Sequence, residues 1–114
     1  MFETIRESAS VQNSVERLVA IVDARSAAEA AAQIAQAVSG WATRTDLVID
    51  DATEVWAAAG RARQAAERAE IAPTVEEARA AARAAWAAMT TAQEAEARVT
   101  ATIVESLIAP PIAA

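Results

Sequence analysis

The stretch that decides the fold is AEIAPTVEEARAAARAAWAAMT, residues 69–90. Pro73 lacks a backbone N–H and biases Ala72 away from helical dihedral angles, so a helix that arrives from the N-terminal side must end there. Thr74 can cap a new helix, and Glu77 three residues later completes a capping box. Because so few residues separate the two helices, the stretch predicts an antiparallel helical hairpin rather than a flexible joint.

The composition of the 114-residue chain is typical of an all-α protein. Hydrophobic residues make up 54% of the chain, but roughly a third of all residues are alanine. Alanine is the best helix former, and the chain has only two glycines and three prolines. Because alanine buries little apolar area, the hydrophobic driving force is weaker than the percentage suggests. We expect one all-helical domain over residues 1–114, small enough for partners to help complete its core.

Apolar residues recur at helical spacing on both sides of the turn. The seam before the turn consists of Ile34, Val38, Trp41, Thr45, Val48, Ala52, Val55, Ala59, Ala62, Ala66 and Ala69. The seam after it consists of Val75, Ala78, Ala82, Ala85, Met89, Ala92, Ala95, Val99, Ile103 and Leu107. Both seams are nearly pure alanine close to the turn and carry larger side chains farther away. This pattern predicts a long, coiled-coil-like hairpin that is tight at the turn and wider at its open end.

An N-terminal helix is expected to fill the open end of this hairpin. It has an apolar stripe at helical spacing, formed by Val11, Val15, Leu18, Val19 and Val22. Ser26 and Glu29 form a second capping box, which predicts that another helix begins there. The predicted helices therefore cover about residues 2–22, 26–71 and 74–108, followed by an apolar tail at 109–114. The expected architecture is a three-helix bundle.

The middle of the chain leaves two alternatives open. Unbroken heptad spacing favours one continuous helix over residues 26–71, with or without a kink. Alternatively, the helix breaks near residues 40–50, with Gly40 at its C-terminal cap and Thr43 or Thr45 at the start of the next helix. The break would convert the three-helix bundle into a four-helix bundle.

The residue inventory argues against an enzyme. The chain has no cysteine, histidine, tyrosine or lysine, so the usual nucleophiles, general bases and zinc ligands are missing. We therefore expect no catalytic residues, no cofactor and no metal. The net charge of −6 argues against a nucleic-acid partner. No signal peptide and no membrane span are recognisable, so we expect the protein in the cytoplasm or in a particle assembled there.

One cluster of carboxylates is a candidate binding face. Asp46, Asp50 and Glu54 recur every four residues, so a helix would align them, and Asp51 lies beside them. Such a face could dock a basic protein partner, although a solvated helix surface explains the same pattern. Hard-cation binding is a weaker alternative, and the spacing does not match an EF-hand loop.

A second group of candidates is apolar. Trp56 and Trp86 should lie at nearly the same level of the hairpin, where they either clasp the first helix or anchor another subunit. The candidate interface residues are Trp41, Trp56, Trp86, Leu107, Ile108 and Ile112. The last of them belongs to the tail beyond Pro110 and Pro111, which is more apolar than a free terminus usually is.

Two functional hypotheses follow from these patterns. The first is a non-enzymatic structural or assembly protein that associates with itself through helical faces into an oligomer, filament or particle. The alternative is a small acidic adaptor or inhibitor that presents Asp46, Asp50, Asp51 and Glu54 to a basic protein.

Replacing Pro73 with alanine tests the turn, because alanine continues a helix where proline ends one. We expect the two flanking helices to fuse and the chain to form a longer dimer. Light scattering after size-exclusion chromatography would measure the mass, and small-angle X-ray scattering would measure the length. An unchanged mass and length would show that Pro73 does not enforce the reversal.

Overall fold

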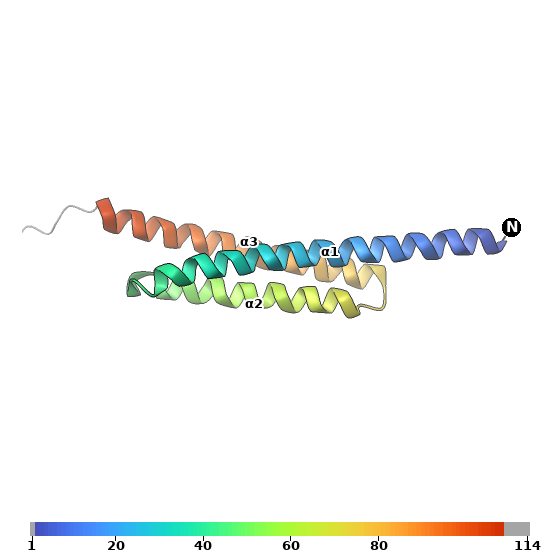
Figure 1. Ribbon diagram of the computed structural model, residues 1–114, viewed down its shortest axis with the longest axis horizontal. Coiled ribbons are helices and arrows are strands. Elements are labelled where there is room, and N and C mark those ends of the chain that lie inside the picture. Colours follow the sequence, from blue (N-terminus) through green and yellow to red (C-terminus); the bar gives the residue numbers. More distant parts are fainter. Residues whose placement is uncertain (1, 109–114) are drawn as a thin grey trace, which may run out of the picture.

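The computed structural model of the protein describes the backbone of residues 2–108 and the side chains of residues 9–108. Its elements are α1 (Phe2–Ala42), the short 3₁₀ helix η1 (Asp46–Val48), α2 (Ile49–Ile71) and α3 (Val75–Ile108). The three long helices run up, down and up, and each packs against the other two (Figure 1). The predicted all-α three-helix bundle is confirmed. The predicted tail at 109–114 lies outside the described residues.

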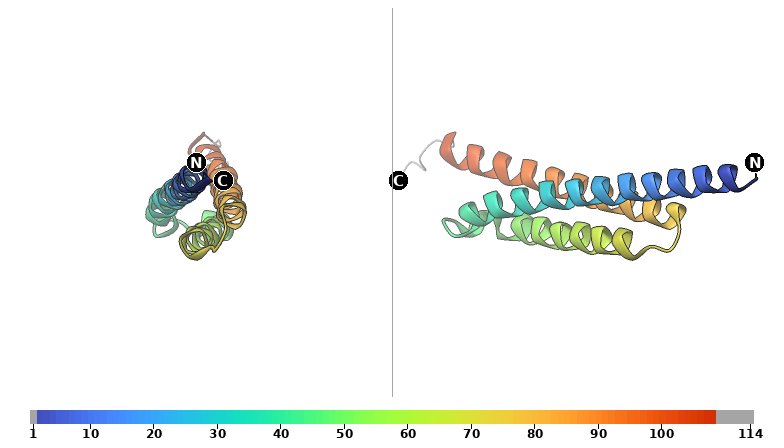
Figure 2. Two further views of the ribbon diagram at one scale, coloured as in Figure 1. Left: turned by 90° about the vertical axis from the view of Figure 1, so that its right-hand side faces the viewer. Right: turned by 45° about the vertical axis from the view of Figure 1, so that its right-hand side comes forward.

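The bundle is a rod, and its helices are staggered along it. It measures only 19 × 16 Å across, and its radius of gyration of 20.0 Å exceeds the roughly 13 Å expected for a compact domain of about this length. The N-terminal part of α1 projects past the turn between α2 and α3 (Figures 1 and 2). The C-terminal part of α3 projects past η1 at the opposite end of the rod (Figures 1 and 2).

The turn at Pro73 forms as the sequence predicts. Helix α2 ends at Ile71, and Ala72 has extended dihedral angles, with φ −61° and ψ 128°. The Thr74 hydroxyl accepts a hydrogen bond of 3.1 Å from the backbone N–H of Glu77. Thr74 therefore caps α3, and the predicted antiparallel hairpin of α2 and α3 is confirmed.

The predicted helix boundary between residues 22 and 26 is wrong, because α1 continues through it to Ala42. The Ser26 hydroxyl donates a 3.0 Å hydrogen bond to the carbonyl oxygen of Val22, one turn earlier in the same helix. It therefore does not cap a new helix. Neither glycine nor proline interrupts the segment, and the alanines around it favour continuation of the helix.

Helix α1 ends at Ala42, so the prediction of a single helix over residues 26–71, which heptad spacing favoured, is also wrong. Thr45 is extended, and its hydroxyl accepts a 3.2 Å hydrogen bond from the Leu47 backbone N–H. This hydroxyl gives the backbone an alternative to helical hydrogen bonding, and a new helical segment begins at the next residue, Asp46. The alternative start at Thr45 is right, whereas Gly40 lies inside α1 and is not its C-terminal cap.

The core consists mainly of alanine. Among the described side chains, 24 hydrophobic residues are buried, and 18 of these are alanine. The six larger ones are Val38, Val48, Val55, Met89, Val99 and Ile103. The α3 seam from Ala78 to Ile103 is buried as predicted, whereas Leu107 is 76% exposed. Small side chains let the helix backbones approach closely, so the core is narrow and dense.

The N-terminal half of α1 joins the core through a different face from the predicted one, whereas Val38 is buried as predicted. The buried residues of α1 are Ala20, Ala24, Ala27, Ala31 and Val38. The predicted stripe of valines and leucine is exposed. The prediction failed because it selected the largest apolar residues, whereas the alanine seams of α2 and α3 pack more closely against another alanine face.

Two arginines of α1 fix its register against α2. Arg25 Nη2 lies 2.6 Å from Oε1 of Glu70, and Arg17 Nη2 donates a 3.3 Å hydrogen bond to the Glu70 carbonyl oxygen. That carbonyl lies in the last turn of α2, where the helix dipole favours a cation. The N-terminal half of α1 is thereby held against the turn end of the hairpin.

Replacing Ala62 with leucine tests the narrow core, because Ala62 is fully buried in α2. The added atoms must push helices apart, so we expect the free energy of unfolding to fall by about 1–3 kcal/mol. The matched control is Ala57→Leu at an exposed position of the same helix, which should change it by less than about 0.5 kcal/mol. Chemical denaturation measures both, and equal effects would argue against close packing.

Candidate functional site

The most prominent surface feature is an apolar stripe on α1. We use the name outer stripe for Val11, Val15, Leu18, Val19 and Val22. Each of these five residues is between 53% and 63% exposed. Scattered exposed hydrophobic residues are ordinary in proteins, whereas a contiguous set on one helix face is a candidate interaction surface.

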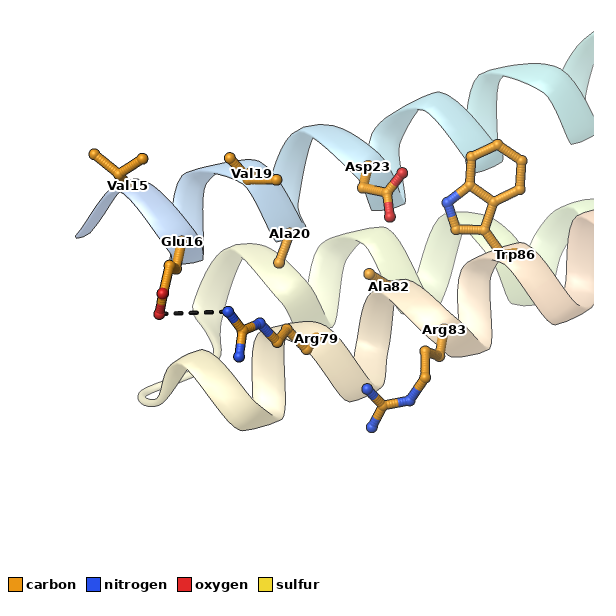
Figure 3. A pocket seen from close by; sticks show the side chains of 9 residues that line it. All are labelled: Val15, Glu16, Val19, Ala20, Asp23, Arg79, Ala82, Arg83 and Trp86. Carbon is orange, nitrogen blue, oxygen red and sulfur yellow. Dashed lines mark ion pairs between the residues drawn. The ribbon is translucent and has the colours of Figure 1, made fainter. Parts of the chain in front are cut away.

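The outer stripe lies on the side of α1 opposite its buried alanines. At about 100° per residue, the five stripe residues span less than a third of the helix circumference, and Ala20 and Ala24 lie roughly half a turn away. Figure 3 shows the same division: Ala20 points toward the other helices, whereas Val15 and Val19 lie on another side of α1, at the rim of the groove between α1 and α3. Helix α1 therefore has two apolar faces, a small-residue face in the core and a large-residue face in solvent.

The outer stripe ends abruptly toward the C-terminus of α1. On the same outer face, the following residues are Ser26, Glu29 and Gln33, all exposed. The apolar surface is therefore confined to the N-terminal half of α1, about 18 Å of helix at 1.5 Å per residue. This short, bounded patch has the dimensions expected for contact with a few turns of another helix.

A groove lies beside the outer stripe, between α1 and α3. It has a volume of about 470 Å³, and Val19, Ala82 and Trp86 contribute its apolar lining. Figure 3 shows the Trp86 ring rising from α3 toward α1. An ion pair of 3.4 Å between Arg79 Nη2 and Glu16 Oε2 crosses the groove at one end. Trp86 therefore lies beside α1, and because it is 38% exposed, part of its ring also faces solvent.

The other two tryptophans lie on α2 and at the C-terminal end of α1. Trp56 of α2 donates a 2.9 Å hydrogen bond from Nε1 to the Ser39 hydroxyl, and that hydroxyl donates to the Ala35 carbonyl oxygen. Trp41 lies near the end of α1, where the Arg44 guanidinium stands 5.5 Å from its ring centroid. Each indole keeps about two-fifths of its surface exposed.

The predicted acidic face is partly neutralised within the protein. Arg98 of α3 donates hydrogen bonds to Glu54 and to Asp51, the latter at 3.1 Å from Nε to Oδ1. The bond to Glu54, and then the bond to Asp51, raise the pKa of Arg98 above its ordinary value. Asp50 is exposed at the start of α2, and Asp46 lies in η1. The four carboxylates therefore do not form one uniform acidic row.

The last predicted interface residues lie at the C-terminal end of α3. Leu107 is 76% exposed and Ile108 is 74% exposed, and Val104 adds a third apolar side chain there. Ile112 lies outside the described residues. Among the side chains of residues 9–108, no group of three or more acidic residues is placed to hold a metal ion. None of the helices in this part of the chain has a stretch long and apolar enough to cross a lipid bilayer.

Sequence reasoning missed the contacts that join different helices. It found the outer stripe as a set of residues but placed it in the core. It paired no cation with the acidic face, although Arg98 binds two of its carboxylates. Ser39, which accepts the Trp56 hydrogen bond, carries no recognisable signal, because any serine on α1 could have faced α2.

Comparisons with known proteins assign no family to the chain. No protein-family model matches it, and comparisons with curated proteins and with solved structures gave no significant match. The surface of the bundle is therefore the basis for inferring function.

A double-mutant cycle tests the contact between Trp56 and Ser39. Trp56→Phe removes the donor and Ser39→Ala removes the acceptor, so we expect a coupling energy of about 0.5–1.5 kcal/mol in the free energy of unfolding. Chemical denaturation of the two single variants and the double variant provides the value. Simple additivity of the two losses would mean that the hydrogen bond contributes nothing to stability.

Proposed function

We propose that this protein is a non-enzymatic structural or assembly protein that associates with itself through the outer stripe of α1. The supporting observation is that the core consists mainly of alanine, whereas most of the large hydrophobic side chains lie on the surface. Among the described side chains, 14 large hydrophobic residues are exposed, whereas only six are buried. Five of the 14 form the outer stripe on one face of a single helix.

Association would give this bundle apolar burial that its own core does not supply. Covering the outer stripe contributes roughly 1 kcal/mol for each partly exposed side chain, or about 10 kcal/mol for two copies. The cost of association is of comparable size, roughly 4–15 kcal/mol. We therefore expect self-association that is reversible and depends on concentration, with the further exposed residues at Val104, Leu107 and Ile108 available for a larger assembly.

The acidic adaptor has less support than self-association. Two of its four carboxylates, Asp51 and Glu54, already bind Arg98 within the chain. A basic partner would have to compete with an arginine that is held by two hydrogen bonds. The proposal of a non-enzymatic role rests on the residue inventory, since the chain lacks histidine and cysteine, and the proposed place of assembly is the cytoplasm or a particle formed there.

Replacing Leu18 with glutamate tests the proposal, because it places a charge in the centre of the outer stripe without changing a buried residue. We expect the unmodified protein to increase in mass with concentration and the Leu18→Glu protein to stay monomeric. Multi-angle light scattering measures the masses, and circular dichroism checks that helix content is unchanged.

Gln33→Glu is the matched control, since it adds the same charge on the same outer face beyond the stripe. Its self-association should equal that of the unmodified protein. Equal association of the Leu18→Glu protein would remove the outer stripe as the contact surface, and a monomer at every concentration of the unmodified protein would contradict the proposed function.

A further inference from the structure

We propose that the outer stripe binds the outer stripe of a second copy in antiparallel orientation, about a two-fold axis that passes between Glu16 and Arg17. This inference rests on the proposed function and names the partner and the register of the same surface. A two-fold contact uses the same patch on both copies, so the pattern of the stripe must complement itself when reversed.

Four of the five residues of the outer stripe have this property. The spacings from Val11 to Val15, Leu18 and Val22 are four, three and four residues, which read the same in both directions. In the antiparallel register, Val11 lies opposite the partner's Val22, and Val15 lies opposite the partner's Leu18. Two such pairs occur on each side of the axis, so four apolar layers form as in a short coiled coil, and Val19 flanks them at the level of the partner's residue 14, a serine.

The charges just beyond the stripe favour antiparallel over parallel pairing. Arg25 and Glu29 continue the same three-and-four spacing on α1. In parallel pairing, Glu29 would meet the partner's Glu29, which places like charges in one layer, whereas Arg25 is held by Glu70 of α2. In the antiparallel register, the position level with Glu29 is residue 4 of the other copy, a threonine.

The stagger of the bundle favours the same orientation. Each chain carries a net charge of −6, and parallel copies would lie side by side along their whole length. Antiparallel copies overlap through the N-terminal half of α1, whose first turns project past the hairpin turn (Figure 2). The two hairpins then point in opposite directions from the shared stripe, and they lie side by side over a shorter length than in the parallel arrangement.

Each copy has one outer stripe and uses it for one partner, so this contact joins two copies and cannot add a third. We therefore expect a dimer from this surface. Four layers bury less than the roughly 800 Å² per partner of a standard interface, so the dimer should dissociate on dilution.

Engineered cysteines test the register, since the chain contains no native cysteine. Antiparallel packing places residue 11 next to residue 22 of the other copy, but it separates two copies of residue 22 by about 16 Å along the axis. A disulfide needs Cα atoms roughly 4.4–6.8 Å apart. We expect a mixture of Val11→Cys and Val22→Cys proteins to form a disulfide at least tenfold faster than either variant alone under mild oxidation.

A Gln33→Cys protein gives the rate of disulfide formation by random collision. Rapid cross-linking of Val22→Cys with itself would show parallel packing and overturn the inference. A mixture that cross-links no faster than Gln33→Cys, while the unmodified protein gains mass with concentration in light scattering, would overturn the register but leave the proposed function standing. An unmodified protein that stays monomeric would overturn both.

A second measurement leaves the stripe intact. A nitroxide label on Ser26→Cys should give a distance of about 30 Å between the labels of an antiparallel dimer. Parallel packing would place the labels about 10 Å apart, close to the interaxial distance of packed helices. At dimer-forming concentration, double electron–electron resonance reports the long distance and dipolar broadening of the continuous-wave spectrum reports the short one, which would overturn the inference.

Discussion

The close approach of three alanine faces is the contact on which this structure depends. Helices α1, α2 and α3 each present a row of small side chains to the other two, and 18 of the 24 buried hydrophobic residues are alanine. Close backbone approach gives dense packing, but it removes little apolar area from water for each residue. The bundle is therefore held together by many small contacts spread along its length, and it has no large central core.

A core of this kind has a consequence for the surface. It has no room for large side chains except at a few positions such as Val38, Met89 and Val99. The valines and the leucine of the outer stripe are excluded from it and remain in solvent, on the side of α1 away from its alanines. The same constraint that makes the bundle narrow thus creates the surface that we propose for self-association.

Polar contacts between helices fix the register that alanine packing leaves loosely specified. Small, similar side chains would tolerate a shift by one turn, because each layer of the core resembles the next. The contacts of Arg25 with Glu70, Trp56 with Ser39, and Arg98 with Asp51 and Glu54 each join two helices at one level. All of them lie at exposed or half-exposed positions, where each contributes modestly but acts at a different place along the rod.

The sequence by itself determined the helical class, the reversal at Pro73 with its cap at Thr74, and the buried seam of α3, because these depend on local backbone preferences and on spacing within one helix. Only the tertiary structure decided which face of α1 is buried, since both faces are apolar and the choice depends on the shape of the other two helices. It also decided that helix α1 continues through Ser26 and ends before Thr45. The reason is that a serine or threonine hydroxyl can either bond back to the preceding turn of its own helix, as at Ser26, or cap a new helical segment, as at Thr45. The acidic residues were visible in the sequence, but their partner Arg98 is more than forty residues away, and only folding brings the two together.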